Sequence, residues 1–357
     1  MNDDFQQHMA EAARLMRSGD LREATTAIQQ ALGMTPPASA PAPTVDDVID
    51  IEARVVHEHA RERESERPAP PPAASRSRPE SFLAGHFRNE AGARDFKLFQ
   101  PAGGGGALPL VVMLHGCTQD PDDFARGTRM NALARERGFL VLYPSQSQRA
   151  NAQRCWSWFK HNHQARGKGE PAILAGMVRD VIATHEVDPS RVYVAGLSAG
   201  GAMAAILGDA YPDVFAAVGV HSGLPTGSAR DVQSAFAAMK GGAQPAGRTG
   251  RQGPTPPTIV FHGDADGTVN VVNGERVIEA AGLKSRPAAT RGSSAQGVPY
   301  SRRVYPDGQG VDQAEQWTIH GAGHAWSGGD ASGSYTDPRG PDASAEMLRF
   351  FLQHPLR

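Results

Sequence analysis

The 357-residue sequence has little cysteine, little net charge and no long apolar run. With only two cysteines, Cys117 and Cys155, it is neither a disulfide-dense scaffold nor a four-cysteine metal site. A formal net charge of -2 gives no basic field for nucleic acid or an anionic membrane, so we expect neither partner. No stretch approaches the roughly 18 consecutive apolar residues of a spanning helix, and we expect no membrane insertion.

The first residues also lack the basic and then apolar order of a secretory signal, so we expect a cytoplasmic protein. The sequence does contain 39% hydrophobic residues, which are enough to fill a sizeable core. Length and composition therefore indicate one large globular domain with an appendage.

The first 80 residues differ in texture from the rest. Residues 1–33 carry apolar side chains at helical spacing on both sides of a break at 18–20, which predicts a helical hairpin similar to a single tetratricopeptide repeat. Such a unit cannot bury its apolar face alone, so we expect it to self-associate or to dock on a partner. Residues 34–80 are rich in Pro, Ala and Arg, which predicts a linker with a short charged helix.

From residue 81 to 357, short apolar runs alternate with helical patterns, which is typical of an α/β domain with a mostly parallel central sheet flanked by helices. The pattern predicts an edge hairpin at 85–88 and 94–99, and further strands at 108–114, 139–143, 191–195, 216–221, 258–262 and 315–320. It predicts helices at 123–137, 171–186, 199–210, 271–281 and 343–353.

Residues 196–200 read G-L-S-A-G between an apolar strand at 192–195 and a helix-forming stretch at 202–207. This is the strand, sharp turn and helix of a nucleophile elbow. Glycine is needed on both sides of Ser198 because a side chain there would collide with the neighbouring strand and helix. Although the pentapeptide alone is weak evidence in a chain with 40 glycines, its context makes Ser198 the candidate nucleophile.

A serine nucleophile needs a base and a carboxylate that orients the base, which follow it in the order Asp or Glu and then His on this kind of sheet. Asp266 lies just past the strand at 258–262, and Asp264 is its competitor. His324 lies in a glycine-rich loop after the last predicted strand, and His320 is the rival. We predict Asp266 as the orienting carboxylate and His324 as the base; the alternatives are a turn or helix-capping role for the aspartates and a loop histidine bonded to backbone for His324.

Hydrolysis through a tetrahedral intermediate also needs backbone N–H groups that stabilise the oxyanion. Ala199 follows the nucleophile at the start of a helix, so its N–H is one predicted donor. The loop at 115–119 reads H-G-C-T-Q after the strand at 108–114, and the N–H of Cys117 is the second. A tight turn at the strand end is the alternative interpretation of this loop.

Together, the H-G-C-T-Q loop, the segment C-W-S-W at 155–158, the elbow, the H-G-D-A-D-G-T-V loop at 262–269 and H-A-W at 324–326 resemble the polyhydroxybutyrate depolymerase family of esterases, which is related to feruloyl and acetylxylan esterases. The resemblance covers residues 81–357. It implies the α/β-hydrolase fold and ester hydrolysis; we expect no metal or other cofactor. Carried over by position, it implies the triad Ser198, Asp266 and His324 with oxyanion donors at Cys117 and Ala199.

Secreted polymer-degrading members of that family carry a signal peptide and usually a polymer-binding module, and this sequence shows neither. We therefore expect a hydroxybutyrate oligomer, a small aliphatic or aryl ester, or intracellular polymer as substrate. The secreted relatives make an extracellular location the alternative to a cytoplasmic one.

The resemblance also suggests a disulfide between Cys117 and Cys155, since both belong to family motifs; two reduced thiols are the alternative that a cytoplasmic compartment favours. Trp156 and Trp326 are candidate substrate contacts, with core packing as the alternative. Residues 228–257 are too long for an ordinary connector and predict either a cap over the active site or a disordered insertion.

Three other functions compete with an ester hydrolase acting on hydroxyalkanoates. A feruloyl or acetylxylan-type esterase has the same machinery. A serine peptidase is disfavoured because no acidic cluster for a substrate amino group stands out. A granule-binding or partner adaptor that works through the N-terminal hairpin is disfavoured because a binding protein need not keep a complete triad and oxyanion loop.

Overall fold

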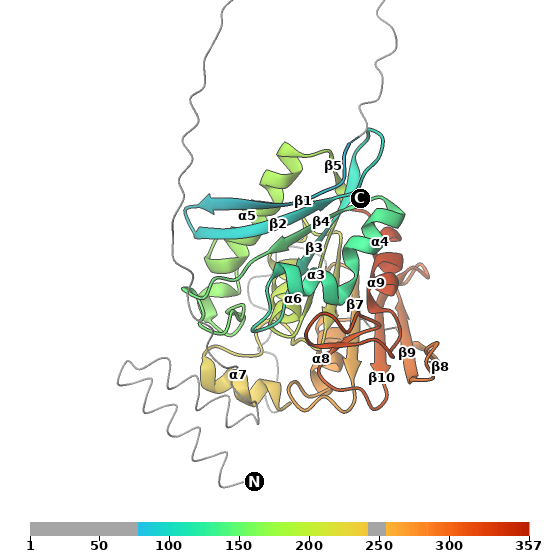
Figure 1. Ribbon diagram of the computed structural model, residues 1–357. Helices are drawn as coiled ribbons and strands as arrows, with labels where there is room; N and C mark the ends of the chain where they lie inside the picture. The colour runs from blue at the N-terminus through green and yellow to red at the C-terminus, as the bar shows by residue number, and fades with distance from the viewer. Residues whose placement is uncertain (1–77, 242–254, 284, 357) are drawn as a thin grey trace, which may run out of the picture. The chain divides into compact units, whose positions relative to one another are not determined.

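The apolar runs of the sequence form the centre of one sheet. In the computed structural model, ten strands of the described chain pair in the order β1-β2-β4-β3-β5-β6-β7-β10-β9-β8 (Figure 1). The strands from β4 to β10 in this order run parallel, and antiparallel hairpins extend both edges. The parallel strands are β4 (Leu140–Pro144), β3 (Leu108–Leu114), β5 (Val187–Leu197), β6 (Ala217–His221), β7 (Thr258–Gly263) and β10 (Asp312–Ile319).

The structure describes residues 78–241, 255–283 and 285–356, all of which belong to the unit Ser75–Arg357. The helical hairpin predicted at 1–33 and the linker up to residue 77 lie outside the described residues. Among the helices that are described, none combines the length and hydropathy that a membrane crossing requires.

Helices cover both faces of the sheet, which explains why its central strands are apolar without a break. On β3, Val112 and Leu114 point into one hydrophobic cluster, and Val111 and Met113 into the other; all four are fully buried. The first face is covered by α5 (Gly169–Thr184), α6 (Ala199–Ala210), α7 (Val232–Met239) and α8 (Val272–Ala280). The second is covered by α3 (Pro121–Thr128), α4 (Met130–Arg137) and α9 (Ala343–Leu352) (Figure 1).

The predicted strands and helices are confirmed, but one helix is split, and an edge hairpin and the short strands β11 (Trp326–Ser327) and β12 (Thr336–Asp337) were not predicted. The helix predicted at 123–137 is two helices, because Arg129 adopts a left-handed conformation with φ 56° between α3 and α4. The predicted edge hairpin is β1 (Ser81–Asn89) and β2 (Gly92–Gln100), but the hairpin of β8 (Ala288–Ser293) and β9 (Pro299–Pro306) at the other edge was not predicted.

The interpretation of residues 228–257 is tested only in part, because 242–254 lie outside the described residues. The part that is described forms α7, which is held to the loop between β7 and α8. The N–H of Asn270 donates to the carbonyl of Met239 at 2.8 Å, and Asn273 Nδ2 donates to the carbonyl of Ala238 at 2.9 Å. This segment therefore buttresses the loop that carries Asp266.

The sheet order brings the loops of interest together. β3 is flanked by β4 on one side and β5 on the other, so the chain reverses its direction of travel across the sheet there. In an open α/β sheet, the crevice outside the carboxyl ends of the strands at such a switch point is where ligands bind. The loop after β3 and the turn after β5, at Ser198, open into it. The loops after β7 and β10 leave the same edge.

Candidate active site

Ser198 occupies a strained turn between β5 and α6. Its backbone has φ 58° and ψ -119°, a combination that costs a residue with a Cβ on the order of 1–3 kcal/mol. The surrounding hydrogen bonds hold it there: the N–H of Ser198 donates to the carbonyl of His221 at 2.9 Å, and its own carbonyl accepts from Ala202 at 2.9 Å. This conformation places the Ser198 hydroxyl at the edge of the sheet, directly before the N-terminus of α6.

The two glycines of the elbow are required by close backbone contacts. A Cβ on Gly196 would lie 2.7 Å from the carbonyl oxygen of Leu114, and one on Gly200 would lie 2.6 Å from that of His115. Real Cβ atoms essentially never approach so closely, so a side chain at either position would push the elbow away from the loop after β3. The predicted reason for these glycines is thus confirmed.

Asp266 and His324 meet across 58 residues of sequence. His324 Nδ1 donates to Asp266 Oδ2 at 2.7 Å, and the other oxygen, Oδ1, accepts from the N–H groups of Thr268 and Val269 at 2.9 Å each. The Asp266 side chain is fully buried, and that of His324 is 13% exposed. Because Nδ1 carries the proton, the Nε2 lone pair of His324 is left to accept one.

Asp266 remains ionised in this buried place. Burial alone would raise its pKa, but hydrogen bonds from His262, His324 and the Val269 N–H outweigh that effect and lower the pKa below its usual range. His262 is fully buried; its Nε2 donates to the carbonyl of Val269 at 2.8 Å and lies 3.5 Å from Asp266 Oδ2. Oδ2 of Asp266 therefore accepts a hydrogen bond from His324 and has the ring of His262 close by, while His262 also fixes the backbone at Val269.

The rival residues form a second pair at the surface. His320 Nδ1 donates to Asp264 Oδ2 at 2.8 Å, and the N–H of Gly321 donates to Asp264 Oδ1 at 2.7 Å. His320 Nε2 lies 2.8 Å from Ser301 Oγ, on strand β9. Both Asp264 and His320 are more than a third exposed. The structure thus pairs the predicted residues with each other and their competitors with each other.

The loop after β3 lies against the elbow. Gln119 orders it: Oε1 accepts from the N–H of Gly116 at 2.9 Å, and Nε2 donates to Asp123 Oδ2 and to the carbonyl of Ser334 at 3.0 Å each. In the described part of the chain, the N–H groups of Cys117 and Ala199 donate to no protein acceptor. The two groups predicted as oxyanion donors are therefore available to a ligand.

Cys117 and Cys155 form a disulfide, with their Cα atoms 4.2 Å apart. The pairing implied by the family resemblance is present in the structure. The segment that follows Cys155 is fixed by the buried Glu170, which accepts from the N–H of Ser157 at 2.7 Å and from Arg94 Nη2 at 3.0 Å. The bridge thus connects the oxyanion loop to a part of the chain that is already anchored.

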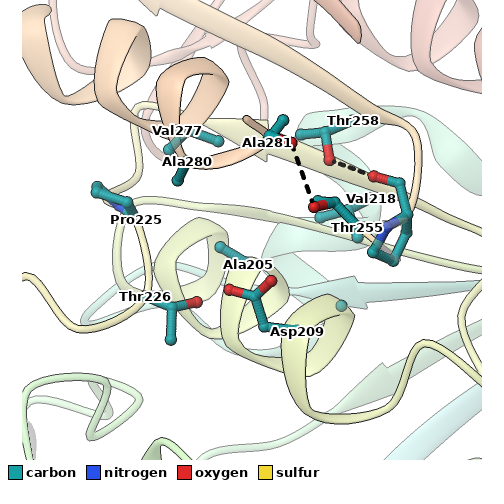
Figure 2. Close-up of a pocket in the computed structure, with 12 residues that line it drawn as sticks. Ala205, Asp209, Val218, Pro225, Thr226, Thr255, Thr258, Val277, Ala280 and Ala281 are labelled. Carbon is teal, nitrogen blue, oxygen red and sulfur yellow. Dashed lines mark hydrogen bonds between the residues drawn. The ribbon is translucent and has the colours of Figure 1, made fainter. Parts of the chain in front are cut away.

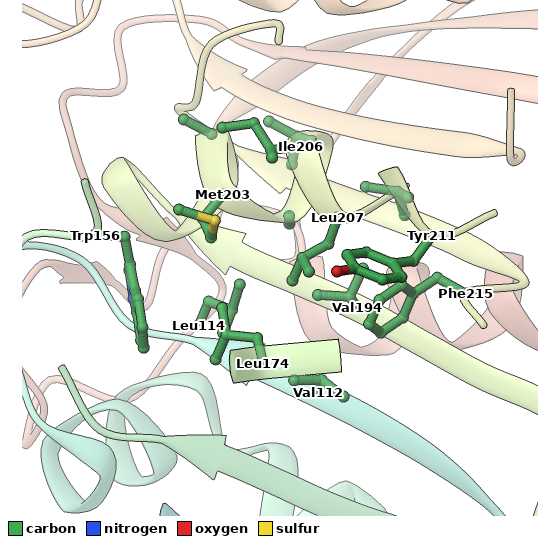
Figure 3. Close-up of a cluster of buried hydrophobic side chains, with 14 of the residues drawn as sticks. Val112, Leu114, Trp156, Leu174, Val194, Met203, Ile206, Leu207, Tyr211 and Phe215 are labelled. Atoms are coloured by element: carbon green, nitrogen blue, oxygen red, sulfur yellow. The ribbon is translucent and has the colours of Figure 1, made fainter. Parts of the chain in front are cut away.

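The expectation that Trp156 and Trp326 contact substrate is contradicted, because both rings are fully buried. Trp156 packs at the end of the hydrophobic cluster near Leu114 and Met203, and its Nε1 donates to the carbonyl of His115 at 3.1 Å (Figure 3). Trp326 stacks on His221 and donates from Nε1 to Ser344 Oγ at 3.1 Å. Both rings therefore pack in the core, and the indole of Trp156 is hydrogen-bonded to the loop after β3.

Two further buried imidazoles hold the loops of the site. Burial lowers the pKa of His221 to about 3 and that of His115 to about 4, so both rings are neutral. Nε2 of His221 accepts from the N–H of Ser327 at 3.0 Å, and Nε2 of His115 accepts from that of Gln146 at 3.1 Å. Protonation would convert each acceptor into a donor and break its bond.

A cavity of about 30 Å³ lies elsewhere, between the C-terminal half of α6 and α8 (Figure 2). Asp209 and Thr226 lie along one side of it, and Val277 and Ala280 along the other. Substrate pockets usually measure several hundred Å³, so this cavity fits a water molecule rather than a substrate. No group of three or more His, Cys, Asp or Glu side chains in the described ranges is placed to hold a metal ion.

Sequence reasoning missed His221, His262 and Glu170 as supports of the site. The signal for His262 was its place directly before the loop of Asp266, at the end of a strand where the other residues are apolar. His221 likewise ends an apolar strand next to the elbow strand. Nothing in the sequence separated Glu170 from an ordinary residue of a helix N-terminus.

The parallel sheet, the elbow at its switch point and the Asp–His pair on the same edge define an α/β-hydrolase. Residues 95–285 match the family model described as Esterase PHB depolymerase. Since this match spans more than half of the chain, the chain belongs to that family of carboxylic ester hydrolases.

Curated relatives agree. Poly(3-hydroxyalkanoate) depolymerase C of Paucimonas lemoignei is 36% identical over 238 residues, covering 63% of this chain and 56% of that protein. Feruloyl esterase B of Thermothelomyces thermophilus is 30% identical over 238 residues, covering 60% of this chain and 78% of that protein. The chain thus spans just over half the length of the depolymerase.

Among solved structures, an acetyl xylan esterase from Aspergillus awamori superposes with a TM-score of 0.56 at 20% identity, covering 73% of this chain and 94% of that one. At this level of identity, the likeness shows a common fold. The predicted α/β-hydrolase fold is confirmed.

Proposed function

We propose that the protein is a serine carboxylic-ester hydrolase with Ser198 as nucleophile, His324 as general base and Asp266 as the residue that orients His324. The observation that carries the proposal is the strained elbow, which leads from the strand end into α6 next to the ordered oxyanion loop. The buried Asp266–His324 hydrogen bond at 2.7 Å supports the assignment of the base.

In the proposed mechanism, Nε2 of His324 takes the proton of the Ser198 hydroxyl as Oγ attacks the ester carbonyl carbon. The N–H groups of Cys117 and Ala199 stabilise the oxyanion that forms. Collapse of the intermediate expels the alcohol, which receives the proton from His324. Water, deprotonated by the same imidazole, then attacks the acyl carbon; Ser198 Oγ leaves and takes the proton back from His324, and the carboxylic acid is released. Asp266 stays ionised throughout and stabilises the imidazolium.

For the substrate, we propose hydroxyalkanoate esters such as hydroxybutyrate oligomers or polymer. The similarity to the depolymerase of Paucimonas lemoignei supports this class. An aryl or sugar ester is the second candidate, supported by the feruloyl esterase and acetyl xylan esterase relatives. A panel of hydroxybutyrate oligomers, feruloyl esters and acetylated xylan separates them, and the largest kcat/KM on either alternative would contradict the first choice.

Ser198→Ala tests the nucleophile, and Ser301→Ala is the control because Ser301 lies within hydrogen-bond distance of the histidine of the other Asp–His pair. We expect S198A to lose on the order of 10⁴-fold or more in kcat on p-nitrophenyl butyrate while S301A stays within about threefold of wild type. Thermal melts of both variants check folding. A folded S198A variant with wild-type turnover would contradict the proposal.

A further inference from the structure

The exposed aromatic side chain next to the oxyanion loop is Tyr335. It precedes β12 (Thr336–Asp337), which pairs with β11 (Trp326–Ser327) just after His324, and its side chain is 37% exposed. Unlike Trp156 and Trp326, it therefore has surface to offer a ligand. The loop that carries it returns over α3 to the residues after β3, where Gln119 donates to Ser334.

Two unusual backbone conformations meet at this place. Tyr335 has φ 52° and Thr118 has φ 66°, in the left-handed region that bulky and β-branched residues rarely adopt. Each is held by hydrogen bonds: the carbonyl of Tyr335 accepts from the N–H of Trp326 at 2.7 Å, and the N–H of Thr118 donates to the carbonyl of Gln153 at 2.6 Å. Such strain persists where the surroundings impose it, and it is common at ligand sites.

The two side chains approach each other directly beside Cys117. Thr118 Oγ1 lies 3.4 Å from the hydroxyl of Tyr335 and donates to the carbonyl of Cys117 at 2.6 Å. A hydroxyl has one proton, and that of Thr118 is used in the shorter bond. The phenol is then the donor in the 3.4 Å contact with Thr118 Oγ1, which is longer than an ordinary O–H···O hydrogen bond, so a ligand oxygen at a shorter distance can take the phenol proton instead.

We propose that Tyr335 is a specificity-determining residue that donates a hydrogen bond to an oxygen substituent at C3 of the acyl group. The inference rests on the proposed function and deepens it. In the proposed mechanism, the N–H of Cys117 binds the carbonyl oxygen of the scissile ester. In a 3-hydroxyacyl ester, the oxygen on C3 is close in space to that carbonyl oxygen. Thr118 is the residue after Cys117, and the phenol of Tyr335 lies beside its hydroxyl, within reach of the C3 oxygen. The site thus selects 3-hydroxyacyl esters over plain alkanoyl esters.

Tyr335→Phe tests the proposal, because it removes only the hydroxyl and leaves the ring and its backbone conformation. The measurement is kcat/KM for methyl 3-hydroxybutyrate and for methyl butyrate, followed by titration of the released acid. Aliphatic methyl esters avoid an aromatic leaving group that would stack on the ring. Tyr305→Phe is the matched control, since its hydroxyl lies 3.4 Å from Gln316 Oε1 on strand β10, outside the oxyanion and Tyr335 loops.

We expect Y335F to lower the ratio of the two kcat/KM values, hydroxybutyrate over butyrate, by about five- to tenfold, which matches the loss of one hydrogen bond. Butyrate hydrolysis stays within twofold of wild type, and Y305F leaves the ratio unchanged. An unchanged ratio in Y335F, with both hydrolyses abolished in S198A, would overturn this inference alone. Wild-type hydrolysis by S198A would overturn the proposed function and this inference with it.

Discussion

Two Asp–His pairs lie side by side on the same loops, and only one has the surroundings of a catalytic base. Asp266–His324 and Asp264–His320 have nearly equal hydrogen bonds, 2.7 and 2.8 Å. The side chains of the first pair are mostly buried, and the Nε2 atom of His262 lies 3.5 Å from its carboxylate. Both side chains of the second pair are more than a third exposed. A short bond between carboxylate and imidazole therefore does not identify a catalytic pair.

The serines differ as well. Ser301, beside His320, lies on strand β9 opposite Thr318 in regular antiparallel pairing. Ser198 lies on a strained turn at a helix N-terminus, beside a loop whose N–H group is available. Because an oxyanion needs such donors at the site of attack, only the elbow serine has the environment for acyl transfer. The comparison teaches that the environment of the serine and the burial of the pair distinguish the two sites.

The largest expected difference between the two pairs is that between the variants Asp266→Asn and Asp264→Asn. An amide at 266 disturbs the tautomer of His324 and stabilises its imidazolium poorly, so we expect kcat on p-nitrophenyl butyrate to fall on the order of 10⁴-fold. D264N removes an exposed pair and is expected to change kcat less than about threefold. Equal losses in the two variants would show that the two pairs contribute alike.

The buried imidazoles make the protein sensitive to acid. In the folded protein, the pKa of His221 is about 3 and that of His115 about 4, both below the ordinary 6.5. As the pH falls, the unfolded chain therefore binds more protons than the folded protein. The stability that these two neutral rings contribute to the fold is fully present above about pH 6.5. It is lost as the pH falls toward their pKa values in the folded protein. When the pH is lowered from 7.5 to 4.5, the two histidines together lower the free energy of unfolding by at most on the order of 5 kcal/mol.

Urea denaturation at both pH values measures this loss. His221→Phe keeps a ring between Phe261 and Trp326 but removes the titrating group. We expect the variant to be less stable at pH 7.5 and to lose less stability on acidification than the wild type. An equal loss in both proteins would show that His221 does not contribute to the acid sensitivity.

His262 sharpens the comparison with a smaller effect. Its Nε2 donates to the carbonyl of Val269 at 2.8 Å and lies 3.5 Å from Asp266 Oδ2, so His262→Leu removes a bond that fixes the Asp266 loop. We expect about a three- to tenfold decrease in kcat with little change in KM, as for the loss of one neutral hydrogen bond. His262→Gln, which keeps an N–H donor, is expected to recover part of the loss. Identical kinetics of the Leu and Gln variants would contradict a hydrogen-bonding role.

The sequence predicted those parts of the fold and site that depend on local pattern. Buried strands were recognisable because a sheet covered on both faces needs continuous apolar runs, as in β3. The elbow was recognisable because its geometry demands glycine at 196 and 200. Chain order then distinguished Asp266 and His324 from most other acids and histidines, although their rivals two and four residues away had the same order.

The rest depended on contacts between distant residues. In the β8–β9 hairpin, β8 is mostly exposed and β9 is only partly buried, so neither strand has a continuous apolar run, and pairing with β10 forms the hairpin. The break at Arg129 has no glycine or proline at the left-handed position itself, and Gly127 lies two residues earlier, inside α3. An aromatic residue near a catalytic motif reads alike whether it faces solvent or core, which is why Trp156 and Trp326 were misassigned and Tyr335 was overlooked.

Labelling with a fluorophosphonate tests the central claim most directly, because the reagent reports which serine is activated in the intact protein. After one equivalent has reacted, tryptic digestion separates the peptide that carries Ser198 from the one that carries Ser301. The account predicts the adduct on Ser198, in proportion to the activity lost, with Ser301 unmodified. An adduct on Ser301, or full inactivation with Ser198 unmodified, would contradict it.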